Sequence, residues 1–325
     1  MRPYFFEKII ANKKVVSSSF YRRIFGFKFK KELDLYCISE QPTLMYHSVG
    51  CNIVGGSSIN DIKSHIEKIR YAFSMNNLDL KKSIVITFDD GYKSSIPAIK
   101  MLLANGFRVI IFYPINLKGF RFLPKDCIRV VLSRVKKGSI IKIGDFTIRV
   151  LFNSQEYRRY ISIVLNRKLM NTMCRQQYLA EISRFCVEHE NSLHENCLEH
   201  ELMSFEDIIN IKRLSNQFTV GTHGRSHYRF DRITDSVEIE LEIIETKYEI
   251  EKKTNMVVNS IAYPYGIYNS IIEKKAVCLY ENVYRVKKCY TNYPEKSIPR
   301  DSLDGISVKT VHVLKSQEFS FNENY

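Results

Sequence analysis

Two adjacent carboxylates follow a short apolar run in this sequence. Asp89 and Asp90 come directly after residues 83–88 and precede Gly91. The apolar run predicts a buried parallel strand. Acids beside a buried strand cost solvation free energy unless a cation or hydrogen-bond donors receive them. The pair therefore indicates a site for positive charge, although an Asp-Asp-Gly sequence is also typical of a turn or a helix cap.

Two histidines further along the chain are spaced to hold a metal ion. Three residues separate His223 from His227, so a helical turn or a tight loop would bring both imidazoles to one side. This spacing is common on protein surfaces and is weak evidence alone. Joined by one carboxylate of the Asp89–Asp90 pair, it forms a set that suits Zn²⁺, and also Co²⁺, Ni²⁺ or Fe²⁺. The second carboxylate would then be available as a base.

Strands that alternate with helices must position these residues. Helix caps are expected at Ser94 or Ser95, and at Ser204 with Asp207 in the reciprocal position. The rhythm predicts an α/β fold with a mostly parallel sheet or barrel, whose active sites lie at the carboxyl ends of the strands. The expected strands are 43–47, 83–88, 108–113, 218–220, 260–263, 283–286 and 306–313, and the expected helices are 59–75, 96–103, 204–214, 236–253 and 269–279.

The alternation of predicted strands and helices becomes irregular between about residues 115 and 200. That stretch predicts a short hairpin at 140–152 and helical segments of mixed charge. We interpret it as an insertion that caps the substrate groove. Residues 1–40 are expected to be a basic N-terminal extension, and residues 41–325 one β/α barrel domain that carries the insertion.

The composition is basic. Lysine and arginine number 49 against 35 aspartates and glutamates, a formal net charge of +14. This charge suits an acidic glycan, a phosphate-bearing carrier lipid or a membrane surface, although a basic solvated surface is the more ordinary explanation. No nucleic-acid-binding signature is present, so nucleic acid is not an expected partner. The sequence leaves the oligomeric state open.

Cysteine usage and the N-terminus favour a cytoplasmic protein. The eight cysteines form no C-x-x-C pair, and residues 1–31 lack the continuous apolar core of a signal peptide. Reduced thiols are therefore expected. The basic N-terminal residues also allow peripheral contact with the inner face of the membrane.

Three motifs follow one another at the expected strand ends. They are Thr87-Phe88-Asp89-Asp90-Gly91-Tyr92, His223-Gly224-Arg225-Ser226-His227 and Tyr263-Pro264-Tyr265-Gly266, and the stretches 44–48 and 202–207 accompany them. In this order they resemble the polysaccharide deacetylase family (the NodB homology domain, carbohydrate esterase family four), over roughly residues 42–313. The resemblance implies a distorted (β/α) barrel with an insertion. It also implies a metal-dependent hydrolase that removes an N-acetyl group from an amino sugar of a surface polysaccharide or its precursor.

The resemblance implies a metal-binding role for three residues and a base. Asp90, His223 and His227 resemble the family's metal ligands, and Asp89 resembles the base that takes a proton from metal-bound water. The implied cofactor is a divalent metal, Zn²⁺ first, with Co²⁺ or Ni²⁺ as alternatives. The implied partner is a carbohydrate that carries an N-acetylated amino sugar. Cytoplasmic work would put nucleotide- or lipid-linked intermediates at the inner face of the membrane among the substrates.

Further residues of the motifs resemble substrate contacts. Tyr265 resembles the residue whose backbone N–H helps to bind the oxyanion of the tetrahedral intermediate. Pro264 and Tyr265 would line the sugar groove. Tyr92 is expected beside the site, either in contact with substrate or packed behind the ligands.

The sequence departs from the family pattern at two places. Ala262 stands where many members carry an arginine that holds the base aspartate, and Arg300 is the expected replacement, with Asp301 steadying a general acid. The usual late Leu-x-His has no clean match. His312 is the nearest candidate for the acid that protonates the leaving amine, although a lone histidine in an apolar strand is more often structural. His47, at the end of the first strand, is an equally eligible site residue.

Two alternatives remain open. A deformylase, or another hydrolase of a small amide, would use the same residues on a different acyl group. A non-catalytic glycan-binding member of the family is favoured by Ala262 and by the missing general acid. The intact pairs Asp89–Asp90 and His223–His227 argue against it, because a binding module does not need two buried acids beside two histidines.

Overall fold

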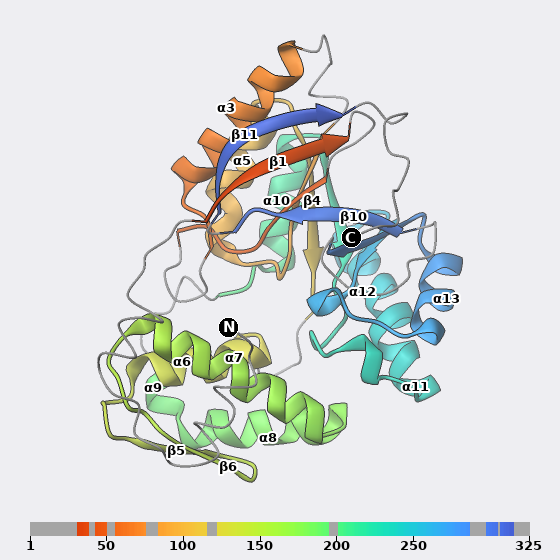
Figure 1. Ribbon diagram of the computed structural model, residues 1–325. Helices are drawn as coiled ribbons and strands as arrows, with labels where there is room; N and C mark the ends of the chain where they lie inside the picture. Colours follow the sequence, from red (N-terminus) through yellow and green to blue (C-terminus); the bar gives the residue numbers. More distant parts are fainter. Residues whose placement is uncertain are drawn as a thin grey trace, which may run out of the picture.

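Seven parallel strands close into a barrel in the order β10-β2-β3-β4-β7-β8-β9 (Figure 1). The computed structural model describes residues 31–38, 43–50, 56–75, 84–115, 122–194, 201–286, 297–304 and 306–314. The barrel strands are β2 (Thr43–Tyr46), β3 (Val85–Phe88), β4 (Arg108–Tyr113), β7 (Phe218–Thr222), β8 (Ser260–Ala262), β9 (Asn282–Val286) and β10 (Ser297–Ser302). The predicted α/β barrel is confirmed.

Helices connect the strands and cover the barrel. They are α3 (Ile59–Met75), α5 (Ile96–Ala104), α10 (Phe205–Leu214), α11 (Ser236–Ile239), α12 (Thr246–Thr254) and α13 (Ser270–Leu279). Short turns of helix lie at η1 (Lys93–Ser95), η3 (Phe230–Arg232) and η5 (Pro264–Gly266). The helix expected at 236–253 contains a π-helical turn, η4 (Glu240–Glu245), between α11 and α12. Among the described helices, none has the length and hydropathy that a membrane span requires.

The two expected helix caps differ in outcome. Ser204 caps α10 as predicted, because its Oγ accepts from the backbone N–H of Asp207 at 3.1 Å while its own N–H donates to that carboxylate at 2.9 Å. Ser95 occupies the N-cap position of α5 as expected, but its side chain does not make the capping hydrogen bond. The Ser95 hydroxyl instead donates to the carbonyl of Tyr92 at 2.6 Å.

A separate two-stranded sheet lies outside the barrel. Strand β1 (Lys31–Ile38) runs parallel to β11 (Ile306–Leu314), and α3 lies near β11. The strand expected at 306–313 is therefore present, but it does not close the barrel; β10 does. Residues 31–38 of the expected N-terminal extension form β1, and residues 1–30 lie outside the described part of the chain.

Residues 122–194, which lie between β4 and α10 in the sequence, form a helical insertion beside the barrel (Figure 1). The predicted hairpin is present as the antiparallel pair β5–β6. Buried residues of the insertion such as Leu165, Tyr178 and Ile182 belong to the same hydrophobic cluster as the barrel strands and their covering helices. Its elements are α6 (Pro124–Arg134), β5 (Ile140–Ile143), β6 (Phe146–Arg149), α7 (Gln155–Thr172), α8 (Arg175–Glu188) and α9 (Glu190–His194).

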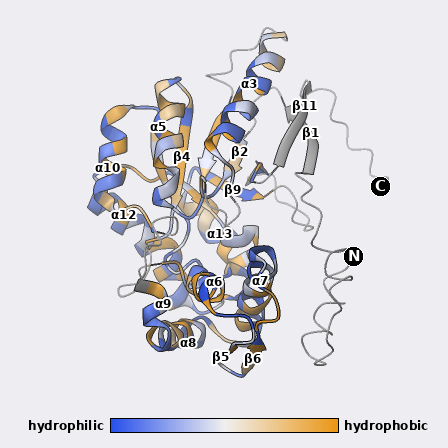
Figure 2. Ribbon diagram, turned by 90° about the vertical axis from the view of Figure 1, so that its left-hand side faces the viewer, coloured by the Kyte–Doolittle hydropathy of each residue, from blue (hydrophilic) through white to orange (hydrophobic). Residues whose placement is uncertain are grey.

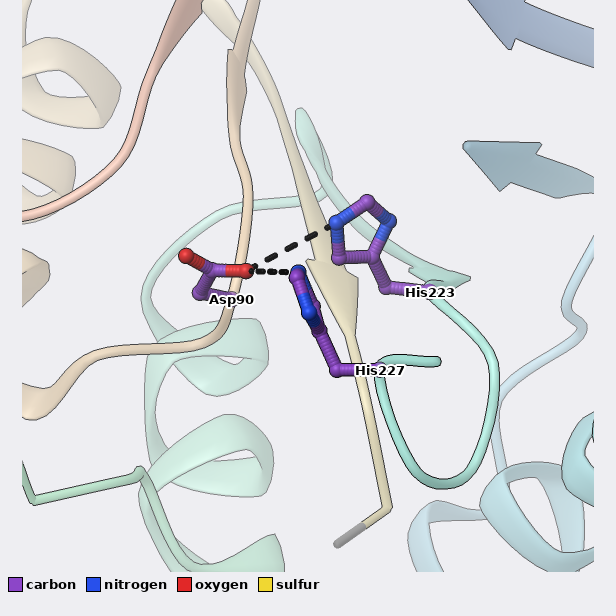
Figure 3. Close-up of side chains that lie close together, drawn as sticks. All are labelled: Asp90, His223 and His227. Carbon is purple, nitrogen blue, oxygen red and sulfur yellow. Dashed lines mark ion pairs between the residues drawn. The ribbon is translucent and has the colours of Figure 1, made fainter. Parts of the chain in front are cut away.

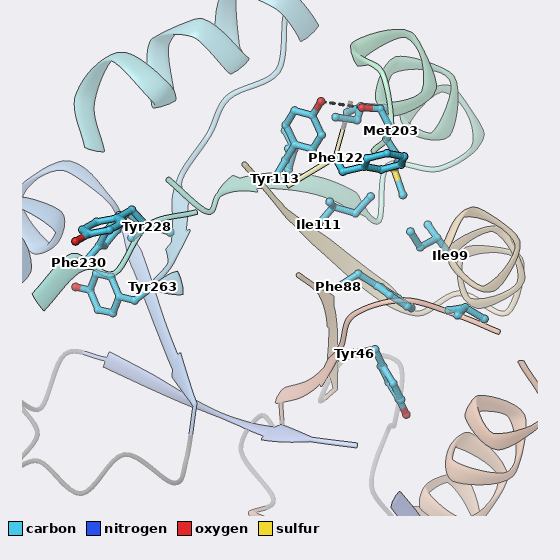
Figure 4. Close-up of a cluster of buried hydrophobic side chains, with 14 of the residues drawn as sticks. Tyr46, Phe88, Ile99, Ile111, Tyr113, Phe122, Met203, Tyr228, Phe230 and Tyr263 are labelled. Carbon is cyan, nitrogen blue, oxygen red and sulfur yellow. Dashed lines mark hydrogen bonds between the residues drawn. The ribbon is translucent and has the colours of Figure 1, made fainter. Parts of the chain in front are cut away.

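The main core packs between the strands and the covering helices. Figure 4 shows Phe88 and Ile111 from neighbouring strands beside Ile99 of α5. Each such side chain contributes about 1.5–3 kcal/mol when it is fully buried. The Tyr113 hydroxyl keeps a partner in this core, because it donates to the carbonyl of Met203 at 2.7 Å (Figure 4). Figure 2 shows strand β4 in the hydrophobic colour, with hydrophilic residues on α3 and α10.

The alternation of side chains along β3 determines which acid enters the barrel. Val85 belongs to a small cluster with Phe112 and Ala262, separate from the main core that holds Phe88. Successive side chains of a strand point to opposite faces. Continued past β3, this period places Asp89 on the side of Val85, toward the interior of the barrel.

Candidate active site

Asp90, His223 and His227 converge at the carboxyl ends of β3 and β7 (Figure 3). One carboxylate oxygen, Oδ1 of Asp90, lies 2.8 Å from Nε2 of His227 and 3.6 Å from Nε2 of His223. All three side chains are buried, and their candidate ligand atoms lie within 4.8 Å of one another. The structure thus brings together the three residues expected to hold a metal ion.

A left-handed turn aims Asp90 at the histidines. Asp90 has φ of 69° and Gly91 has φ of 66°. Aspartate tolerates this region better than most residues, and glycine adopts it without strain. A Cβ at Gly91 would also lie 2.5 Å from the ring of Tyr113. The Asp-Gly sequence is therefore required by the backbone as well as by the chemistry.

The two imidazoles are held neutral, as metal binding requires. Nδ1 of His223 lies 2.8 Å from the carbonyl of Ala262, so that nitrogen donates and Nε2 keeps its lone pair toward Asp90. Burial is the main cause that lowers the pKa of His223 to about 3. Burial and then the Lys125 ammonium lower the pKa of His227.

An unsatisfied oxygen shows that these residues fit a divalent cation. Oδ1 of Asp90 is buried and has no hydrogen-bond partner among the described residues. Such an orphaned acceptor costs free energy unless a positive group joins it. In a tetrahedral zinc site with bonds of about 2.0–2.1 Å, ligand atoms lie about 3.3 Å apart. The separations of 2.8 and 3.6 Å lie on either side of that value.

A lysine from the insertion lies against the same carboxylate. Nζ of Lys125, on α6, lies 2.6 Å from Oδ2 of Asp90 and 3.3 Å from Nε2 of His227. Burial alone would raise the pKa of Asp90, but Lys125 and then His227 hold it well below its usual range. Lys125 was not among the residues expected from the sequence, because it lies in the insertion and no motif marks it.

Arg300 holds the second aspartate. Its guanidinium donates to both oxygens of Asp89, at 2.5 and 2.8 Å, and to Oγ1 of Thr87 at 3.1 Å. Arg300 is fully buried and stacks over the ring of Phe112, 4.9 Å from its centre. Burial opposes ionisation of Asp89, but Arg300 and then His223 lower its pKa. Arg300 thus makes the contact with Asp89 that was expected of it, since position 262 holds alanine. This contact keeps Asp89 ionised.

His47 follows β2, the strand next to β3 in the barrel, and its side chain pairs with Asp304. Its Nδ1 lies 2.5 Å from Oδ2 of Asp304, and its side chain is 30% exposed. Burial alone would lower the pKa of His47, but Asp304, with smaller effects from Asp90 and Asp89, raises it to about 8. A protonated imidazole at neutral pH beside Asp89 is what a general acid requires. Asp304 was not anticipated.

The residues first expected to supply the acid lie elsewhere. His312 is on β11, where it pairs with Tyr36 of β1 in the sheet outside the barrel. Asp301, expected to steady the acid, is on β10 and pairs in register with Leu44 of β2. A different histidine–aspartate pair, His47–Asp304, lies near the metal ligands.

Tyr265 lies beside His227, and Pro264 precedes it in the chain. The ring of Tyr265 packs edge-on to His227, with centroids 4.7 Å apart, and its hydroxyl accepts from Asn166 of the insertion at 3.2 Å. Tyr265 has φ of 60° in η5, directly after the buried Pro264. Tyr92 is fully buried, and its hydroxyl donates to Asp126 at 2.6 Å. It therefore packs behind the site and offers no exposed surface to a sugar.

A buried glutamate organises the loop that carries the histidines. Glu242, in η4, accepts from the backbone N–H of Arg225 at 2.6 Å and from that of Ser226 at 3.2 Å. Arg175 of the insertion neutralises it at 2.5 Å. Gly224, with φ of 70°, leaves room for this carboxylate, because a Cβ there would lie 2.8 Å from Oε2. Nothing in the local sequence pattern marks Glu242 or Arg175 as partners of this loop.

Comparison with known proteins supports the resemblance noted in the sequence. Residues 202–279 match the family model described as Polysaccharide deacetylase. That segment contains the loop with both histidines and the Tyr263–Gly266 motif, so the resemblance is confirmed for this part of the chain. Asp89 and Asp90 lie before the matched segment. No curated protein matches the chain.

Several solved structures are similar to the chain at low identity. A polysaccharide deacetylase from Bacillus cereus has 16% identity and a TM-score of 0.46, over 83% of this chain and 66% of its own. A de-N-acetylase from Aggregatibacter actinomycetemcomitans has 11% identity and a TM-score of 0.44, over 82% and 94%. IcaB from Ammonifex degensii has 12% identity and a TM-score of 0.46, over 82% and 92%. The chain thus spans about two thirds of the Bacillus protein.

Proposed function

We propose, from the polysaccharide deacetylase match of residues 202–279, that the protein is a metal-dependent hydrolase. It removes an N-acetyl group from an amino sugar of a polysaccharide or of its precursor. The observation that carries the proposal is the buried set Asp90, His223 and His227, beside a second aspartate held ionised by Arg300. A divalent cation, Zn²⁺ first, would polarise the acyl oxygen and acidify a water molecule when bound there.

The chain's own residues supply the proton transfers. Asp89 accepts the proton of the water that attacks the acyl carbon, and its bidentate contact with Arg300 fixes its orientation. The backbone N–H of Tyr265 is the donor we assign to the oxygen that becomes negative. As the carbon–nitrogen bond breaks, the leaving nitrogen takes a proton from His47, which Asp304 keeps protonated. The products are acetate and a free amino sugar.

The first test is the metal content of the purified protein after reconstitution with Zn²⁺. We expect about one metal ion per chain in the wild type, and loss of that ion in Asp90→Ala and in His223→Ala, because each removes one of three ligands. Elemental analysis after dialysis measures this directly. Asp145→Ala and His189→Ala are matched controls, since both residues lie in the insertion outside the metal set.

Two results would redirect the proposal. A wild-type protein that retains no Zn²⁺, Co²⁺ or Ni²⁺ would exclude the hydrolase and leave a family member that only binds glycans. Metal binding with release of formate, and no acetate from N-acetylated amino sugars, would identify a deformylase on the same site. Chromatography of the released acid distinguishes the two acyl groups.

The pH dependence of turnover tests the acid. His47 has its pKa raised to about 8, so the protonated form is present below that pH and is lost as the pH rises through it. We expect kcat to decline above about pH 8. Asp304→Asn removes the charge that contributes most to raising the pKa of His47. The decline of kcat at alkaline pH should therefore begin at a lower pH in this variant. Rates measured from pH 5 to 10 give both profiles, and coincident profiles would exclude His47 as the acid.

A further inference from the structure

A basic cavity lies between the insertion and the barrel, next to the metal ligands. Its volume is about 330 Å³. Four cationic side chains line it: Lys125 and Arg129 from α6, Arg167 from α7, and Arg229 from the loop after His227. The described residues that line it include no carboxylate. A cavity with this lining favours an anionic occupant.

Two residues that line the cavity also contact the proposed metal ligands. Lys125 lines it and also contacts Asp90 at 2.6 Å. Tyr265, which packs against His227, forms another part of the wall, and its hydroxyl bonds to Asn166 of α7 at 3.2 Å. A ligand in the cavity would therefore contact side chains that themselves touch Asp90 and His227.

The charges in the cavity are only partly neutralised. Arg129 pairs with Asp126 at 3.1 Å, and Arg229 pairs with Asp231 at 2.6 Å. Arg167 is exposed and makes no ion pair among the described residues. Lys125 pairs with Asp90, the carboxylate that a divalent cation would share. Once that cation is bound, the positive charge of Lys125 is no longer fully balanced, which strengthens the attraction of the cavity for an anion.

We infer that this cavity binds an anionic group, a phosphoryl or a carboxylate, carried by the amino sugar whose acyl group is removed. The inference rests on the proposed function, since it names the class of substrate that the same site accepts. Guanidinium groups match the geometry of both anions, and Arg167 and Arg129 present theirs from two helices. The volume falls at the small end of ligand sites, which suits one charged group and part of a sugar ring.

Calorimetric titration of the zinc-reconstituted protein tests this inference. The ligands are N-acetylglucosamine, N-acetylglucosamine 1-phosphate and N-acetylglucosaminuronic acid. At least one anionic sugar should bind roughly tenfold more tightly than the neutral sugar, because charge-assisted hydrogen bonds are stronger than neutral ones. The tighter of the two anionic sugars identifies the group. In Arg167→Gln the ratio of anionic to neutral affinity should fall several-fold.

A control separates the cavity from general charge. Arg149→Gln removes an exposed arginine of β6, in the same insertion but outside the cavity lining, and should keep the wild-type ratio. Equal binding of all three sugars, or an unchanged ratio in Arg167→Gln, would overturn the inference. Acetate measured after each titration tests the hydrolase separately. Preferential binding of an anionic sugar without release of acetate would exclude the proposed reaction but support the anion site. Release of acetate without such a preference would support the reaction but exclude the anion site.

Discussion

Replacement of Asp89 by asparagine is expected to lower kcat by about 10²–10⁴-fold, the usual contribution of a general base. The amide cannot accept the proton of the attacking water. Asp89 is not one of the three candidate metal ligands, which are Asp90, His223 and His227. The variant should therefore retain about one metal ion per chain. Release of acetate from an N-acetylated amino sugar measures the rate, and elemental analysis measures the metal.

The pH profile distinguishes loss of a base from structural damage. Arg300 and His223 hold the pKa of Asp89 below its usual value, so the wild type should stay active down to acid pH. Asp89→Asn should be slow at every pH, with no acid limb that belongs to this group. Asp145→Asn, in the turn of the insertion hairpin, is the matched control. A metal-loaded Asp89→Asn protein within tenfold of wild-type kcat would exclude Asp89 as the base.

Replacement of Arg300 by glutamine is expected to lower the free energy of unfolding by about 3–5 kcal/mol at pH 7, the usual cost of breaking a buried ion pair. Both partners are buried, and the pair includes two short hydrogen bonds. Asp89 would remain as a buried charge without its main counter-ion. Urea denaturation, followed by circular dichroism with a chelator present, measures the difference without contributions from bound metal.

The loss of unfolding free energy in Arg300→Gln should become smaller as the pH falls. In the wild type the lowered pKa of Asp89 gives stability that is present above the unfolded pKa and is lost as the pH falls through the folded value. In Arg300→Gln, burial raises the pKa of Asp89, so protonation at acid pH relieves the unpaired charge. The two proteins should therefore approach each other in stability as the pH falls. Arg300→Lys, which keeps the charge but not the two parallel bonds, should lie between them at pH 7.

Most of the barrel could be predicted from the sequence because its strands are apolar and its helices carry a periodic apolar pattern. The α3 helix and strand β4 have the predicted bounds. Strand β10 was not predicted, because Pro299 and two charged residues interrupt its apolar pattern and proline is uncommon inside strands. Strand β1 carries a usable signal in the alternation of Leu33, Leu35 and Cys37, which the basic composition of the surrounding residues obscured.

The metal-binding residues could be predicted, whereas the residues that support them could not. Asp90, His223 and His227 belong to motifs whose residue types restrict the chemistry. Lys125 and Glu242 have no local signature. Their partners are distant in the sequence and meet only through tertiary packing. A lysine at the start of a helix, or a glutamate in an amphipathic helix, is usually a solvated surface residue, and only the fold identifies these two as buried.

The contacts between the insertion and the barrel have a consequence for folding. Lys125 neutralises Asp90, and Arg175 neutralises Glu242, so the insertion supplies cations to two acids buried at the barrel. A barrel that folded before the insertion would hold both acids as uncompensated charges, at a cost of several kcal/mol each. The two parts are therefore energetically coupled and should unfold in a single cooperative transition. The insertion is therefore part of one folding unit with the barrel. An experiment that transfers the insertion to another protein would also have to transfer Asp90 and Glu242, the acids that its cations neutralise.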